Sequence, residues 1–151
     1  PQYLFLDEPT TGLDPQTRSN IWETIKELQR SRGMTVFLTT HYMEEAAEAD
    51  YVVIIDKGRI AARGTPSELR DRYTSDRLVI STSRGDELCA LLERGKRAYR
   101  RQGDALSVEL VSTFEALVLV GEWRSYIDSF EVLKGTMDDA FIAITGKEIR
   151  S

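Results

Sequence analysis

Three short apolar segments dominate the first third of the chain: residues 3–6, 35–39 and 51–55. They are rich in β-branched and aromatic residues, and polar residues do not alternate with apolar ones inside them. This pattern is typical of strands buried on both faces, as in a parallel sheet covered by helices. Segments of helical character lie between them. We therefore expect a β-α-β-α-β order and an α/β fold.

The first helix of this series has clear boundaries. Asp14 is suited to cap it, Pro15 fits its first turn, and Gly33 fits its end. Apolar residues recur at helical spacing and predict the face that packs on the sheet: Ile21, Ile25 and Leu28. A second helix is expected from Met43 to about residue 49.

A turn at residues 56–59 and a short strand at 59–63 follow the third apolar segment, and Thr65 can cap the next helix. The pattern changes near residue 73, from which we predict a strand, a helix, two strands, a helix, a strand and a helix. Their ranges are 77–82, 86–94, 97–101, 105–111, 113–124, 127–134 and 137–145. This order is mixed α+β and close to ferredoxin-like. The predicted domains are therefore residues 1–73 and residues 74–151.

Composition narrows the function classes. The net charge is −5 and the sequence pI is about 5.0, which disfavours general nucleic-acid binding. One basic cluster interrupts this acidic background and is interpreted as a solvated face: Lys96, Arg97, Arg100 and Arg101. Cys89 is the one cysteine and His41 the one histidine, so an internal disulfide and a usual structural zinc site are both excluded.

Polar residues that can take part in catalysis or metal binding follow two of the predicted strands. Asp7 and Glu8 come directly after the first, and His41 follows the second. If these strands are neighbours, two carboxylates and an imidazole meet at one edge of the sheet. Such a group suits metal-assisted hydrolysis of a phosphate, with one acid for Mg²⁺, one for the attacking water and the imidazole for a charged oxygen. Each residue taken singly also has an ordinary structural explanation.

Four segments together resemble ABC ATPases. Tyr3-Leu-Phe-Leu-Asp-Glu-Pro9 resembles the Walker B motif, and Thr10-Thr-Gly-Leu-Asp-Pro15 resembles the D-loop that follows it. Residues 39–45, Thr-Thr-His-Tyr-Met-Glu-Glu, resemble the segment of the switch histidine. Residues 49–60 with Gly64-Thr-Pro66 resemble the stretch that closes the ATPase domain. The resemblance covers residues 1 to about 72 and implies part of a P-loop NTPase sheet, followed by a small accessory domain.

The resemblance also implies roles for the site residues. Asp7 is expected to organise Mg²⁺ through water, and Glu8 to be the catalytic carboxylate that acts on the attacking water. His41 is expected to contact the γ-phosphate of ATP. Asp14 is expected at the interface between two ATPase domains, a role compatible with capping its helix. ATP and Mg²⁺ are thus the implied cofactors.

The segment His41-Tyr-Met-Glu-Glu-Ala resembles the branch of ABC ATPases that serves drug, antibiotic or polysaccharide exporters. The resemblance implies a transmembrane permease and a second ATPase subunit, identical or different, as partners. It implies a cytoplasmic location at the inner face of the cell membrane. No nucleic-acid partner is expected.

Two motifs of the family have no match in the chain. No G-x-x-x-x-G-K-[ST] segment and no Leu-Ser-Gly-Gly segment occurs, although the first cradles the phosphates. The chain also opens directly on an apolar strand, which favours a piece of a longer protein. We expect residues 1–151 alone to be inactive, and the sheet to have a gap between the strands 35–39 and 51–55.

Three other functions remain open from the sequence. The chain could act as a dimerisation or regulatory fragment through residues 74–151. It could belong to a non-transport ABC ATPase of DNA repair or translation, although residues 56–60, Asp-Lys-Gly-Arg-Ile, favour transporters. A flavodoxin-like domain with Asp7 as phosphoacceptor would explain the β-α pattern, but it leaves Glu8, the 13–15 turn and His41 unexplained together.

Overall fold

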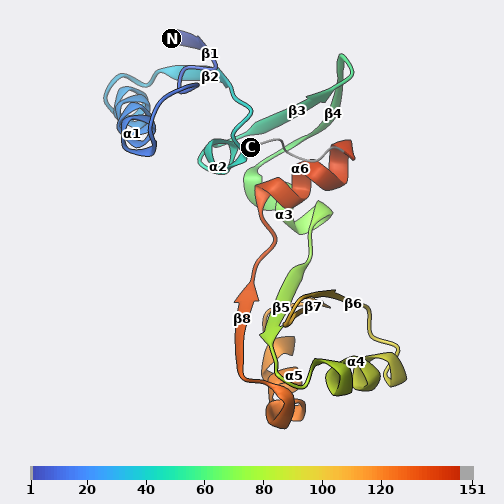
Figure 1. Ribbon diagram of the computed structural model, residues 1–151. Coiled ribbons are helices and arrows are strands. Elements are labelled where there is room, and N and C mark those ends of the chain that lie inside the picture. The colour runs from blue at the N-terminus through green and yellow to red at the C-terminus, as the bar shows by residue number, and fades with distance from the viewer. Residues whose placement is uncertain (1, 147–151) are drawn as a thin grey trace. The chain divides into compact units, whose positions relative to one another are not determined.

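The computed structural model describes residues 2–146 and divides into two compact units, one ending at Ala49 and one beginning at Asp50 (Figure 1). The first unit contains β1 (Tyr3–Asp7), α1 (Pro15–Arg32), β2 (Thr35–Thr39) and α2 (Met43–Ala46). Strands β1 and β2 are parallel, and their register pairs Tyr3 with Thr35 and Asp7 with Thr39. The expected parallel β-α-β arrangement is confirmed for these elements.

Helix α1 begins and ends where its sequence predicts. The Asp14 carboxylate accepts a hydrogen bond from the Thr17 backbone N–H at 3.0 Å, so one donor of the first turn is satisfied. Gly33 follows the helix with φ of 58°, a left-handed conformation that glycine reaches without steric conflict. Ile25, on the predicted inner face, is buried.

The second unit opens with a hairpin of β3 (Val52–Asp56) and β4 (Arg59–Gly64). Lys57 and Gly58 connect them with φ of 50° and 74°, the positive pair that a type I′ turn requires. Helix α3 (Pro66–Tyr73) follows behind a capping box formed by Thr65 and Glu68. Strands β3 and β4 pair with each other in antiparallel register, and the expected gap between the strands 35–39 and 51–55 stays a prediction.

The prediction that the first three apolar strands are buried on both faces is wrong for the described residues. In β1 and β2, Phe5 and Phe37 stack with ring centroids 5.0 Å apart, yet Phe5 is 71% exposed. In the hairpin, Ile55 and Ile60 are also exposed. The apolar pattern indicates strands suited to a covered sheet, and residues 2–146 provide no cover for these side chains.

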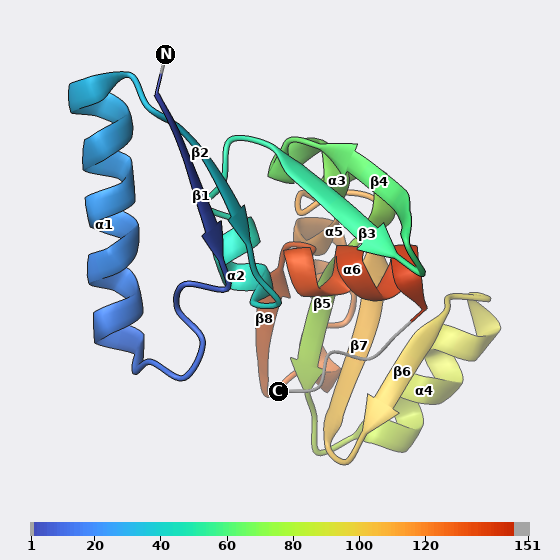
Figure 2. The same ribbon diagram turned by 90° about the horizontal axis from the view of Figure 1, so that it is seen from above.

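The remainder of the second unit has the ferredoxin-like order of elements. The series is β5 (Asp76–Ser81), α4 (Gly85–Arg94), β6 (Tyr99–Gln102), β7 (Ala105–Leu110), α5 (Glu115–Glu122), a 3₁₀ turn (Arg124–Tyr126) and β8 (Ser129–Leu133). The strands are antiparallel in the order β6-β7-β5-β8, as Figure 2 shows. Residues 74–151 thus contain the predicted β-α-β-β-α-β series.

One apolar core joins this sheet to its two helices. Strands β5 and β7 and helices α4 and α5 all contribute buried side chains, and Trp123 and Ile127 complete the cluster. Its fully buried members are Leu78, Ile80, Leu88, Leu92, Leu106 and Val108. This small domain therefore has a core of its own, which the strands of the first unit lack.

Helix α6 (Met137–Thr145) does not belong to that core. It packs against α3 and β4, and Figure 1 shows it beside α3. Leu69 of α3 and Met137 and Ala140 of α6 are buried. The compact second unit therefore begins at Asp50, whereas the domain boundary between residues 73 and 74 stays a prediction.

The basic cluster of residues 96–101 is partly neutralised. Arg97 pairs with Glu115 at 2.5 Å, and Arg101 pairs with Asp86 at 2.6 Å. These pairs fit the interpretation of the cluster as a surface feature. Among residues 2–146, no helix has the length and apolar character needed to cross a membrane.

Candidate active site

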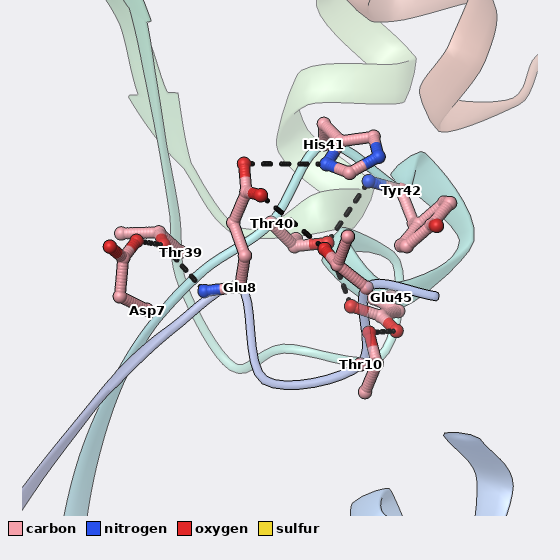
Figure 3. A network of polar contacts seen from close by, with 9 residues as sticks. Asp7, Glu8, Thr10, Thr39, Thr40, His41, Tyr42 and Glu45 are labelled. Carbon is pink, nitrogen blue, oxygen red and sulfur yellow. Dashed lines mark hydrogen bonds and ion pairs between the residues drawn. The ribbon is translucent and has the colours of Figure 1, made fainter. Parts of the chain in front are cut away.

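The tips of β1 and β2 bring the predicted site residues together. Because Asp7 and Thr39 are paired in the parallel register, the residues after both strands emerge at the same edge. The Thr39 hydroxyl donates a hydrogen bond to the Asp7 carboxylate. The expectation that these two strands are neighbours is confirmed, and it places Asp7, Glu8 and His41 at one edge (Figure 3).

Glu8 occupies an unusual backbone conformation. Its φ is 44°, in the left-handed region that residues with a side chain rarely adopt. Its N–H donates to the backbone oxygen of Thr39 at 3.1 Å and to the Thr39 hydroxyl at 3.0 Å, so β2 holds it in place. Strained backbone of this kind clusters at functional sites. The consequence here is a carboxylate turned out of the strand direction towards His41.

The Glu8 carboxylate lies between two groups. Its Oε1 is 3.4 Å from Nδ1 of His41, and Figure 3 shows the side chain directed at the imidazole. The Thr11 hydroxyl donates to its other oxygen at 3.3 Å. Both Glu8 and His41 are about half exposed, with side-chain exposures of 49% and 50%. A phosphate or a water molecule can therefore reach both.

An aromatic and ionic stack supports the imidazole. The rings of His41 and Tyr42 have centroids 4.2 Å apart, and the Arg18 guanidinium lies 4.6 Å from the centroid of the Tyr42 ring. Arg18 also pairs with Glu44 at 3.0 Å. Helix α1 is thereby connected to the segment that carries His41. Neither Arg18 nor Tyr42 could be recognised from the sequence, because a cation in the first turn of a helix does not indicate contact with a distant ring.

A buried carboxylate lies beneath this edge. Glu45 of α2 is only 4% exposed, and it accepts hydrogen bonds from the hydroxyls of Thr10 and Thr40, the latter at 2.7 Å. Thr10 is itself fully buried. The sequence offered little to reveal Glu45, since two adjacent acids in a helix usually face solvent. The one hint is the apolar character of its neighbours, Met43 and Ala46.

Asp14 lies at the start of α1 with its carboxylate fully engaged. Besides the Thr17 N–H, it accepts from the Thr17 hydroxyl at 2.5 Å. These two hydrogen bonds lower the pKa of Asp14, the hydroxyl contributing most. The geometry accounts for Asp14 as a helix cap. Its predicted role at an interface between two ATPase domains stays a prediction.

The donor set at this edge suits a metal that also binds substrate. Within residues 2–146, no group of three or more His, Cys, Asp and Glu side chains could hold a metal ion by itself. Mg²⁺, however, commonly takes one or two carboxylates and completes its shell with water and substrate phosphates. Asp7 at the strand tip fits that pattern. Its assignment to Mg²⁺ stays a prediction.

A family model and several known proteins match the sequence of this chain. The family described as "AAA domain, putative AbiEii toxin, Type IV TA system" matches residues 1–46. The daunorubicin/doxorubicin resistance ATP-binding protein DrrA of Streptomyces peucetius is 36% identical over 97% of this chain and 47% of its own length. The Nod factor export ATP-binding protein I of Cupriavidus pinatubonensis is 37% identical over 99% of the chain and 46% of its own length.

The homologues of this chain are ABC transporter ATP-binding subunits. The energy-coupling factor transporter ATP-binding protein EcfA1 of Clostridium novyi is 52% identical over 46% of the chain and 25% of its own length. The chain spans about half the length of the curated relatives that match nearly all of it. The predicted resemblance to ABC ATPases is therefore confirmed, and the mixed α/β structure fits a partial ATPase of this kind.

Proposed function

We propose that this chain supplies the water-activating part of an ATP-hydrolysing site in an ABC transporter subunit. The observation that carries the proposal is the meeting of Glu8 and His41, 3.4 Å apart, beside Asp7 at the tips of two paired strands. Names of homologues that include ATP binding support a nucleotide as the ligand. The loop that grips the phosphates comes, in this proposal, from polypeptide outside residues 1–151.

Each residue has a defined task in the proposed reaction. Asp7 would hold Mg²⁺, and the bound ion would supply positive charge that compensates the phosphate oxygens. Glu8 orients the attacking water and accepts its proton. His41 donates to an oxygen of the γ-phosphate as charge develops there. Phosphoryl transfer depends mainly on such positioning and charge stabilisation.

The transport context extends the same proposal. Homologues named for drug resistance and Nod factor export support an exporter. The subunit would couple hydrolysis to transport together with a transmembrane permease and a second ATPase subunit, with Asp14 at the contact between the two ATPase domains. It would work in the cytoplasm, at the inner face of the cell membrane. The transported substrate is chosen by the permease in this arrangement.

The test compares the 151-residue chain with the full-length subunit that contains it. We expect Mg²⁺-dependent release of phosphate from ATP only with the longer protein, because the phosphate grip lies outside the chain. Replacement of His41 by Ala in the longer protein should lower kcat by about 100-fold. The matched control is Lys57→Ala, at the exposed tip of the hairpin, which should leave kcat unchanged. Equal turnover by both proteins would contradict the proposal.

A second candidate function is dimerisation through residues 74–151. The observation that favours it is a set of exposed apolar side chains at and just before α5: Val111, Phe114, Leu117 and Val118. Surfaces of this kind mark contacts with other proteins. A protein spanning residues 74–151 should then have the mass of a dimer in solution, and Leu117→Asp should return it to the mass of a monomer. A strict monomer without the substitution would contradict this function.

A further inference from the structure

A buried hydrogen-bond network joins the two segments that carry the catalytic pair. Thr10 lies two residues after Glu8 in the loop after β1, and Thr40 directly precedes His41. The hydroxyls of both threonines donate to opposite oxygens of the Glu45 carboxylate, Oε1 and Oε2. Figure 3 shows this carboxylate between the two loops. One side chain of α2 thus bridges the Glu8 loop and the His41 loop.

The network leaves little freedom to the Thr40 hydroxyl. This oxygen donates its proton to Glu45 and accepts from the Tyr42 backbone N–H at 3.0 Å. These two hydrogen bonds fix the orientation of the Thr40 hydroxyl and tie it to Tyr42, the residue that follows His41. Since His41 lies between Thr40 and Tyr42, the imidazole is carried by a backbone segment that is anchored at both neighbours.

The burial of Glu45 argues against a role in solubility or surface charge. Burying a carboxylate costs considerable free energy unless hydrogen bonds compensate it. Its neighbour Glu44 provides the comparison, because its side chain is 69% exposed and pairs with Arg18 on the surface. Two acids adjacent in the sequence therefore occupy opposite environments, and the buried one is the one connected to the site.

We propose that Glu45 is a positioning residue for the hydrolytic reaction, holding Glu8 and His41 at contact distance by tying Thr10 to Thr40. This inference rests on the proposed function, because it assigns Glu45 to the same site. Glu45 touches neither water nor phosphate in this account. It acts through the two loops, and its loss leaves ATP binding intact while the catalytic geometry loosens.

The test measures steady-state hydrolysis and ATP affinity in the full-length subunit. Glu45→Ala should lower kcat by about 10- to 100-fold, the range that small misplacements of catalytic groups produce. The dissociation constant for ATP should change less than about twofold, since only transition-state contacts are weakened. Glu48→Ala, an exposed carboxylate just after the same helix that pairs with Lys26, should change neither quantity.

Two milder variants guard against failure of Glu45→Ala to fold. Thr10→Val and Thr40→Val each remove one hydroxyl at nearly constant volume, and each should lower kcat with ATP affinity retained. Combined with Glu45→Ala, they should lower kcat less than the product of the single effects, because all three break one network. Unchanged kcat in Thr10→Val and Thr40→Val, or fully multiplicative effects, would overturn the assignment of Glu45.

A second readout does not depend on activity. In histidine-labelled protein, the imidazole signal of His41, assigned by its loss in His41→Gln, should shift in Glu45→Ala and stay in place in Glu48→Ala. An unshifted signal in Glu45→Ala would contradict the positioning role. Failure of the proposed function is recognised separately: it would appear as full turnover in Glu8→Gln, whatever Glu45 does.

Discussion

Glu8 holds a backbone conformation that costs a residue with a side chain about 1–2 kcal/mol relative to ordinary helical geometry. Two hydrogen bonds from its N–H to Thr39 keep it there. The strained backbone directs the Glu8 carboxylate from the end of β1 towards His41. The same Thr39 hydroxyl donates to Asp7, so a single threonine organises both acids.

The cap of α1 gives a pH-dependent prediction. Because hydrogen bonds lower the pKa of Asp14, its stabilising effect is present above the pKa of the unfolded chain and disappears as pH falls through the folded value. In the full-length subunit, Asp14→Ala should therefore lower the melting temperature clearly at pH 7 and progressively less as the pH falls below about 4. Thermal unfolding measured by circular dichroism reports this difference.

Asp14→Asn is the matched control for the cap. Asparagine keeps a capping oxygen without a titrating group, so its gap from Asp14→Ala should not vary with pH over this range. A difference between Asp14→Ala and the unchanged protein that persists at low pH would contradict the assignment of the charged cap.

The sequence predicted three residues of the candidate site, because a position directly after an apolar strand is informative by itself. Asp7, Glu8 and His41 come after apolar strands, and the carboxyl ends of neighbouring parallel strands lie at one edge of a sheet. Glu45, Tyr42 and Arg18 could not be found in the same way. Their importance arises from contacts between separate segments, such as the Glu45 contacts with Thr10 and Thr40, which no local spacing encodes.

Among the elements, the β-α-β-β-α-β series stands apart because its helices and strands share one closed core. Leu88 of α4 is fully buried in this core, whereas Leu117 of α5 is 75% exposed. Buried and exposed leucines on the two helices of one small domain offer a direct comparison. Their substitution separates core packing from surface exposure.

Leu88→Ala should lower the free energy of unfolding by about 2–5 kcal/mol, because it opens a cavity in a packed interior. Leu117→Ala should change it by less than about 0.5 kcal/mol. Trp123, buried in the same core, reports unfolding by its fluorescence in a Trp22→Phe background. Similar losses for both leucines would contradict the assignment of this core.

The sequence predicted which segments form helices and strands, but it did not predict which of their side chains are buried. The strands and helices of residues 76–133 agree with their local patterns, as does the Lys57–Gly58 turn with its positive φ values. The failure at Phe5 and Ile55 has a physical reason. A continuous apolar run indicates that a strand is suited to burial, but it does not specify which residues cover the strand, and the described residues leave Phe5 and Ile55 exposed.

In the molecule as a whole, the N-terminal and C-terminal parts of the chain differ in how completely each buries its own apolar side chains. The first unit and the β3–β4 hairpin expose large apolar side chains and strand edges that invite association. The ferredoxin-like series buries its own core. Helix α6, the last of the described elements, packs with α3 and β4 instead.

A dissection of the chain tests this difference. Residues 1–72 alone should associate or lack a cooperative melting transition, whereas residues 74–151 should melt cooperatively. Removal of α6 should matter little to the latter, so residues 74–136 should melt within a few degrees of residues 74–151. Calorimetry with sedimentation measures both properties. A monodisperse, monomeric and cooperatively melting 1–72 protein would refute the prediction.

The role of Glu8 is tested most directly by single-turnover hydrolysis of ATP with the full-length Glu8→Gln subunit. Glutamine keeps the shape of the side chain and removes its capacity to accept a proton. We predict that hydrolysis slows by at least about 100-fold, within the range of general base catalysis, while the dissociation constant for ATP stays within about twofold. Hydrolysis at the unsubstituted rate, with ATP bound normally, would contradict the account.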